Sequence, residues 1–136
     1  MIKLIVGPKG AGKTKTMIDM IDNATKTTSG NIVVIEKSMK LTTSINHQAR
    51  LLDVDEYGIQ GGDMLYGFVA GVLAGNYDIT ELFIDGILRI VDHDMDVAAT
   101  VLDKIDAITR DSVEVVITVS ATEDALPEGI KKYMNA

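Results

Sequence analysis

The residues with the clearest chemical meaning stand near the start of the chain, in the stretch Gly7-Pro8-Lys9-Gly10-Ala11-Gly12-Lys13-Thr14. This stretch matches the spacing G-x-x-x-x-G-K-[ST] at every fixed position. Glycines let the backbone curl so that its N–H groups point inward at phosphate oxygens. Lys13 would reach the β- and γ-phosphates, and the Thr14 hydroxyl would bind Mg²⁺. We therefore predict that residues 7–15, which include Lys15, bind a nucleoside triphosphate.

A second candidate group is the carboxylate that follows an apolar run, Leu82-Phe83-Ile84-Asp85. Taken alone, this pattern fits a turn or capping Asp as well as a functional one. Beside a phosphate-binding loop, however, a carboxylate at the end of a neighbouring strand is what Mg²⁺ needs in addition to Thr14. We therefore predict that Thr14 and Asp85 are the metal ligands.

In these two stretches the chain resembles the P-loop NTPase superfamily. Residues 7–14 resemble its Walker A motif, and residues 82–85 resemble its Walker B motif. The resemblance implies an α/β domain that holds a nucleotide, most simply ATP, together with Mg²⁺. Its branch with an additional strand between the two motif strands often carries Glu directly after the Walker B Asp, where this chain has Gly86. Hydrolysis is therefore an open question.

The catalytic base has one further candidate. RecA-like members of the superfamily carry this base at the end of the strand that follows the loop helix, and Glu36 occupies that place in Ile32-Val33-Val34-Ile35-Glu36. We therefore name Lys13 and Glu36 as candidate catalytic residues, with a solvated strand-end Glu36 as the equal alternative.

Other polar residues have simpler interpretations. Ser120-Ala121-Thr122 is similar to a motif of helicase motor domains that senses the γ-phosphate, although an ordinary strand-end turn is favoured. No motif places an arginine at the site, so Arg89 and Arg110 are interpreted as solvated side chains unless they reach a neighbouring subunit. His93 is expected at the surface. Residues 92–96 are predicted to form a solvated turn, with Asp96 capping the following helix.

The elements that would position these residues alternate between short β-branched runs and longer helical segments, the signature of the α/β class. We expect strands at 2–6, 32–36, 82–85 and 114–120, and helices at 13–24, 63–74, 97–109 and 128–134. Residues 37–60 are ambiguous, with a short extra strand at 50–54 as one alternative. Apolar strands that are each followed by a helix predict a three-layer α/β/α sandwich with a mainly parallel sheet. Its βα loops then share the carboxyl edge, where ligands of such sheets bind.

The predicted helix at 63–74 is apolar on most sides, so we expect it to be buried on more than one face. Gly67, Gly71 and Gly75 fall four residues apart. Tight packing of this side onto the sheet is the favoured interpretation, and a dimer contact is the alternative.

Composition limits the class of protein. A chain of 136 residues fits one domain, and the lack of cysteine excludes disulfides and thiolate chemistry. No apolar run has the length of a membrane span, so we expect a cytoplasmic protein. With a net charge of −7 and 4% aromatic residues, strong nucleic-acid binding is not expected.

The predicted function is that of a single-domain Mg²⁺–ATP-binding protein, residues 1–136, which acts as a slow ATPase or nucleotide-dependent switch with a protein partner. A homo-oligomer is compatible with this prediction. Two alternatives stay open, a small-molecule kinase and a module that binds nucleotide without hydrolysing it.

Overall fold

The structure is a computed structural model that describes residues 1–38 and 45–134. The strands of these ranges are β1 (Ile2–Gly7), β2 (Asn31–Glu36), β3 (Ala49–Asp53), β4 (Ile79–Ile84) and β5 (Glu114–Ser120). The helices are α1 (Lys13–Thr27), α2 (Gly61–Ala74), α3 (Ile87–Ile90), α4 (Met95–Thr109) and α5 (Glu128–Lys131), with a 3₁₀ turn, η1 (Glu123–Ala125).

The five strands form one parallel sheet in the order β1-β5-β4-β2-β3. The α/β class and the parallel sheet are therefore confirmed. The short extra strand in the ambiguous region is also present, as the edge strand β3. The order places β5 between β1 and β4, so that the strands carrying the two motifs do not touch. All the strands run the same way, and their carboxyl ends meet at one edge.

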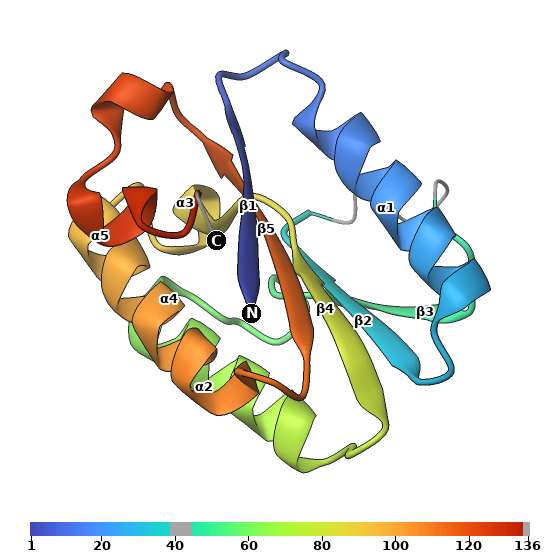
Figure 1. Ribbon diagram of the computed structural model, residues 1–136. Coiled ribbons are helices and arrows are strands. Elements are labelled where there is room, and N and C mark those ends of the chain that lie inside the picture. Colours follow the sequence, from blue (N-terminus) through green and yellow to red (C-terminus); the bar gives the residue numbers. More distant parts are fainter. Residues whose placement is uncertain (39–44, 135–136) are drawn as a thin grey trace.

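Helices lie on both faces of the sheet, an arrangement compatible with a three-layer α/β/α sandwich (Figure 1). Successive side chains of a strand point to opposite faces. Leu82 and Ile84 of β4 accordingly pack in the larger core, under α2, α3, α4 and α5, while Phe83 packs in the smaller core under α1. The strands are apolar on both sides because both sides are covered.

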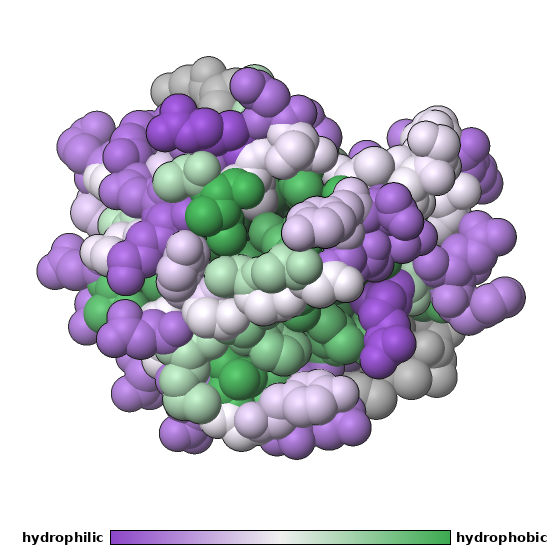
Figure 2. All heavy atoms as spheres, turned by 90° about the horizontal axis from the view of Figure 1, so that it is seen from below, coloured by the Kyte–Doolittle hydropathy of each residue, from purple (hydrophilic) through white to green (hydrophobic). Residues whose placement is uncertain are grey.

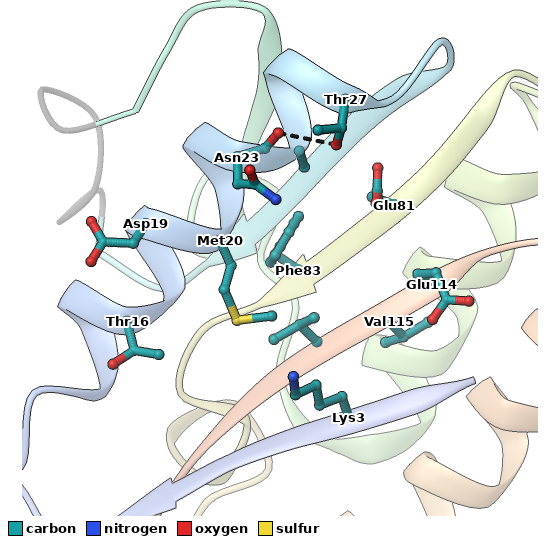
Figure 3. A pocket seen from close by; sticks show the side chains of 12 residues that line it. Lys3, Thr16, Asp19, Met20, Asn23, Thr27, Glu81, Phe83, Glu114 and Val115 are labelled. Carbon is teal, nitrogen blue, oxygen red and sulfur yellow. Dashed lines mark hydrogen bonds between the residues drawn. The ribbon is translucent and has the colours of Figure 1, made fainter.

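The face under α1 is the less completely covered one, because α1 is the only helix on it in the described part of the chain. A groove of about 430 Å³ remains between α1 and strands β1, β4 and β5. Figure 3 shows Met20 reaching from α1 toward Phe83 at its floor. Glu81 and Glu114 are register partners on adjacent strands in this groove. Among the described residues, one buried carboxylate oxygen of Glu81 has no hydrogen-bond partner.

The end of the molecule at which the strands begin lies opposite the carboxyl edge of the sheet, and its centre is apolar (Figure 2). Figure 2 shows this end, with hydrophobic residues gathered near its centre and hydrophilic residues around them. A hollow of about 370 Å³ here is lined mainly by apolar side chains, among them Leu73, Ile108 and Val113. The residues predicted from the motifs, Lys13, Thr14 and Asp85, do not line this hollow but the cavity at the carboxyl edge.

Helix α2 differs from the prediction in the way it is buried. Gly62, Leu65 and Val69 are buried on one side, whereas Gly67 and Gly71 are exposed. The expectation of a helix buried on more than one face is wrong, and so is the packing of the glycine stripe onto the sheet. A Cβ atom at Gly67 or Gly71 would meet nothing within 4 Å, whereas a Cβ at Gly62 would lie 2.4 Å from Val97 of α4. Gly62 is therefore the residue that lets two helices come close.

Several helix ends also differ from the prediction. The capping residue of α4 is Asp94 rather than Asp96, because an Asp94 oxygen accepts hydrogen bonds from the N–H groups of Asp96 and Val97. Helix α1 continues to Thr27, three residues past its predicted end, and α5 ends at Lys131, three residues before its predicted end.

None of the helices in the described ranges combines the length and the apolar character that crossing a membrane requires.

Candidate functional site

The glycine-rich loop joins the end of β1 to the start of α1. Gly10 and Gly12 have φ values of 88° and 85°, in the left-handed region that favours glycine. The carbonyl of Pro8 accepts hydrogen bonds from the Ala11 N–H at 3.1 Å and from the Lys13 ammonium at 2.9 Å. The loop is therefore closed by hydrogen bonds to the Pro8 carbonyl, and one of them holds the Lys13 side chain against the loop backbone.

A cavity of about 730 Å³ opens beside this loop at the carboxyl edge of the sheet. Its lining comes from the loop and the start of α1, from the segment after β4, and from the end of β5. The lining residues are Lys9, Gly10, Gly12, Lys13, Thr14, Asp85, Gly86, Arg89, His93, Thr118 and Ser120. Of the predicted residues, Lys13, Thr14 and Asp85 thus face one space.

Some predicted residues lie outside this lining. Pro8 and Ala11 are joined by a backbone hydrogen bond within the loop. Gly7 is the last residue of β1. The side chain of Lys15 is 82% exposed and pairs with Asp19, one turn further along α1, at 3.4 Å. Lys15 therefore directs its charge toward solvent.

The carboxylate of Asp85 is buried and held by a strand that lies next to its own. The Thr118 hydroxyl on β5 donates a hydrogen bond of 2.7 Å to one Asp85 oxygen. The same hydroxyl accepts a hydrogen bond of 2.7 Å from the Gly86 N–H. Because Thr118 is itself buried, this chain of bonds fixes the direction in which Asp85 presents its second oxygen.

Arg89 places a cation beside that second oxygen. Its guanidinium nitrogen Nη2 lies 4.0 Å from Asp85 Oδ2. A Cβ atom at Gly86 would lie only 2.8 Å from Nε and Nη2 of Arg89, and the φ of Gly86 is 73°. The guanidinium of Arg89 therefore rests against the backbone of Gly86, where a side chain would collide with it.

Glu36 occupies a neighbouring but separate place. It ends β2, and β4 and β5 lie between β2 and the loop strand β1. Its side chain has no exposed surface, so the alternative of a solvated strand-end Glu36 is wrong. The Asp85 N–H donates to the carbonyl of Ile35, which brings the end of β2 next to Asp85. Glu36 is not part of the lining of the cavity.

The lining is cationic although the chain as a whole is acidic. The lining includes three cationic residues, Lys9, Lys13 and Arg89, and one carboxylate, Asp85. A concave site lined by one sign of charge concentrates ions of the opposite sign. With a net charge of −7 on the whole chain, this cavity is a local exception, and it favours an anionic ligand.

Sequence reasoning missed Thr118 and underrated Arg89, His93 and Ser120. Thr118 lies inside a buried strand, and its hydroxyl gains meaning only from its neighbour across the sheet. Arg89 stands four residues after Asp85, a spacing that brings side chains together only if a helical turn follows, as α3 does. His93, expected at the surface, is exposed but also lines the cavity. Ser120, for which a simple turn was favoured, lines it as well.

Comparison with protein-family models and with curated proteins finds no match for this chain.

Proposed function

We propose that the chain is a P-loop protein that binds Mg²⁺–ATP in the cavity at the carboxyl edge and acts as a slow ATPase or nucleotide-dependent switch with a protein partner. The observation that carries this proposal is that Lys13 and Thr14 open onto the same space as Asp85. A triphosphate needs a cation for its terminal groups, and Mg²⁺ needs oxygen ligands from both sides of the site.

The residues present fit such a ligand. The cavity volume of about 730 Å³ lies within the ordinary range for ligand pockets. Helix α1 is fifteen residues long, and its amino end adds a partial positive charge to that of Lys13. Thr14 and Asp85 would hold Mg²⁺, an ion that usually takes only one or two protein carboxylates and completes its shell with water and phosphate oxygens.

The order of the strands also supports membership of the branch with an additional strand, which includes the RecA-like proteins. In this sheet β5 separates the strand that ends at the loop from the strand that ends at Asp85. β5 also contributes Thr118 and Ser120 to the lining. The strand between the two motifs is therefore part of the proposed site.

Within this site, each residue has a distinct task. Lys13 would exchange the Pro8 carbonyl for phosphate oxygens, and Thr118 would keep Asp85 turned toward the metal. Bound Mg²⁺ would withdraw charge from the phosphate oxygens. Slow turnover is expected because Gly86 offers no carboxylate to activate water.

A module that binds nucleotide without hydrolysing it is the second candidate. It is favoured by one observation: among the described residues that line the cavity, Asp85 is the only carboxylate. Measuring phosphate release by the isolated protein separates this module from a slow ATPase.

The binding proposal is tested by thermal unfolding with Mg²⁺–ATP. At about one hundred times its dissociation constant, the ligand should stabilise the fold by ~2.7 kcal/mol, which corresponds to several degrees in Tm. Lys13→Ala should lose most of this shift because the charge on the β- and γ-phosphates is removed. Lys26→Ala, at the other end of α1, removes the same charge far from the cavity and should keep the shift. An equal shift in Lys13→Ala would show that the loop is not the nucleotide site.

A further inference from the structure

We propose that Arg89 binds the terminal phosphate of the nucleotide. Arg89 lies beside Asp85 in the structure, and a bound triphosphate draws its guanidinium to the terminal phosphate, so the cavity distinguishes nucleoside triphosphates from diphosphates. This inference rests on the proposed function and assigns a selectivity to the same site.

The first reason is that Arg89 is only loosely engaged. Its distance of 4.0 Å from Asp85 exceeds the 2.7–2.9 Å typical of a charged hydrogen bond. Asp85 is the one carboxylate within ion-pair distance of Arg89 among the described residues. The charge of Arg89 also reaches Asp55, whose pKa is lowered chiefly by a hydrogen bond from Lys37 and least by Arg89. Arg89 therefore keeps donors available for a further anion.

The second reason is that the backbone makes room for the guanidinium at this point. Gly86 combines a left-handed φ with a missing side chain, and Arg89 Nε and Nη2 lie 2.8 Å from the place where a Cβ atom would stand. The residue directly after Asp85 is thus covered by the cation of Arg89. A base here would activate water, whereas a guanidinium at the same place attracts phosphate oxygens.

The third reason is the chemistry of the exchange. Asp85 is the proposed metal ligand, and its attraction for Arg89 weakens once its charge is shared with a metal ion. A guanidinium is planar, permanently charged and suited to binding two phosphate oxygens at once. With its side chain 30% exposed, Arg89 is free to turn into the cavity. A diphosphate lacks the terminal group, so Arg89 would gain no phosphate contact in its complex.

The test compares the affinities of Mg²⁺–ATP and Mg²⁺–ADP, measured by calorimetry, for the wild type, Arg89→Ala and Arg89→Lys. A charged hydrogen bond to phosphate corresponds to about a ten- to hundredfold effect on affinity. Arg89→Ala should therefore weaken Mg²⁺–ATP binding by that factor and leave Mg²⁺–ADP binding nearly unchanged. Arg89→Lys should recover part of the loss, because a point charge lacks the paired donors.

Arg110→Ala is the matched control, because it removes the same charge from the exposed residue that follows α4. It should keep the wild-type ratio of the two affinities. If the wild type binds both nucleotides and Arg89→Ala keeps that ratio, Arg89 does not bind the terminal phosphate, while the nucleotide site itself stands. If the wild type binds neither nucleotide, both the proposed function and this inference are overturned.

Discussion

The carboxylate of Asp85 is held from two sides, by the Thr118 hydroxyl on one oxygen and by the Arg89 guanidinium near the other. A neutral hydroxyl fixes the direction of a carboxylate without cancelling its charge, whereas a nearby cation partly neutralises it. Thr118 therefore orients Asp85, and in the proposed complex the full negative charge of Asp85 would reach the metal once Arg89 turned to the phosphate. In the proposed complex, this arrangement would link the metal to the terminal phosphate through two neighbouring side chains.

Replacing Asp85 by Asn tests its role as a metal ligand. Asn keeps the shape of the side chain but loses its charge, so we expect the Mg²⁺ dependence of ATP binding to weaken while Mg²⁺-free binding changes little. Thr118→Val should have a smaller effect in the same direction, because it releases the orientation of Asp85 without removing it. Calorimetric titrations with and without Mg²⁺ measure both effects. An equal fall in the two kinds of binding would mean that Asp85 supports the fold rather than the ion.

Glu36→Gln tests the remaining candidate for the base. Loss of a general base lowers a rate by ~10²–10⁴, so phosphate release should fall by this factor while Mg²⁺–ATP binding is retained. Glu56→Gln, at an exposed position further along the chain, is the charge-matched control. Glu36 is buried and is not among the residues that line the cavity. Unchanged turnover in Glu36→Gln would remove it from catalysis.

The residues that the sequence could predict are those whose role follows from their immediate neighbours. Lys13 and Thr14 belong to one continuous stretch, and Asp85 ends an apolar run, so local spacing was sufficient to predict three residues that line one cavity. Thr118 and Arg89 could not be found in this way. Their roles depend on the pairing of β4 with β5 and on the short helix after Gly86, which are properties of the folded chain.

Among the elements, α2 carries a clear prediction for stability. Gly67 and Gly71 lie inside the helix, are exposed, and have open space where a Cβ atom would stand. Gly67→Ala and Gly71→Ala should each raise the free energy of unfolding by ~0.5–1 kcal/mol, because alanine loses less backbone freedom on folding. Urea unfolding measures this change.

Gly62→Ala provides the contrasting variant on the same helix. Its added Cβ atom would lie 2.4 Å from Val97 Cγ1, so we expect a loss of ~1–3 kcal/mol from overpacking against α4. If alanine at Gly67 and Gly71 also destabilised the protein, the outer side of α2 would not be open to solvent in solution.

The elements themselves were more predictable than their orientation. The run at β5 is bounded by polar residues at both ends, and its predicted and observed limits agree. The side of α2 that is buried could not be deduced from the sequence. Apolar residues occur on most sides of that helix, so their spacing does not indicate which face is buried. The cap of α4 was misplaced because three aspartates alternate before it, and only backbone geometry decides that Asp94 accepts the two hydrogen bonds.

On the scale of the whole molecule, net charge predicts weak association with nucleic acid. The chain carries −7, and the cations of the cavity lie within a recess rather than along a continuous surface stripe. We expect only weak, salt-sensitive binding of single-stranded DNA or RNA, measured by fluorescence anisotropy. Submicromolar affinity at physiological salt would contradict this expectation and would favour the motor-domain interpretation of residues 120–122.

The order of the strands in the sheet also affects how the protein is made. β1, which carries the glycine-rich loop, pairs only with β5 in the described sheet, so that Ile2 meets Val115. Of the described strands, the ribosome releases β1 and its loop before the others and β5 after them. Until β5 has left the exit tunnel, β1 and the loop that follows it therefore have no paired strand. Contacts between residues so far apart in the chain close slowly, and the proposed nucleotide, which would stabilise only the finished fold, could assist none of the earlier steps.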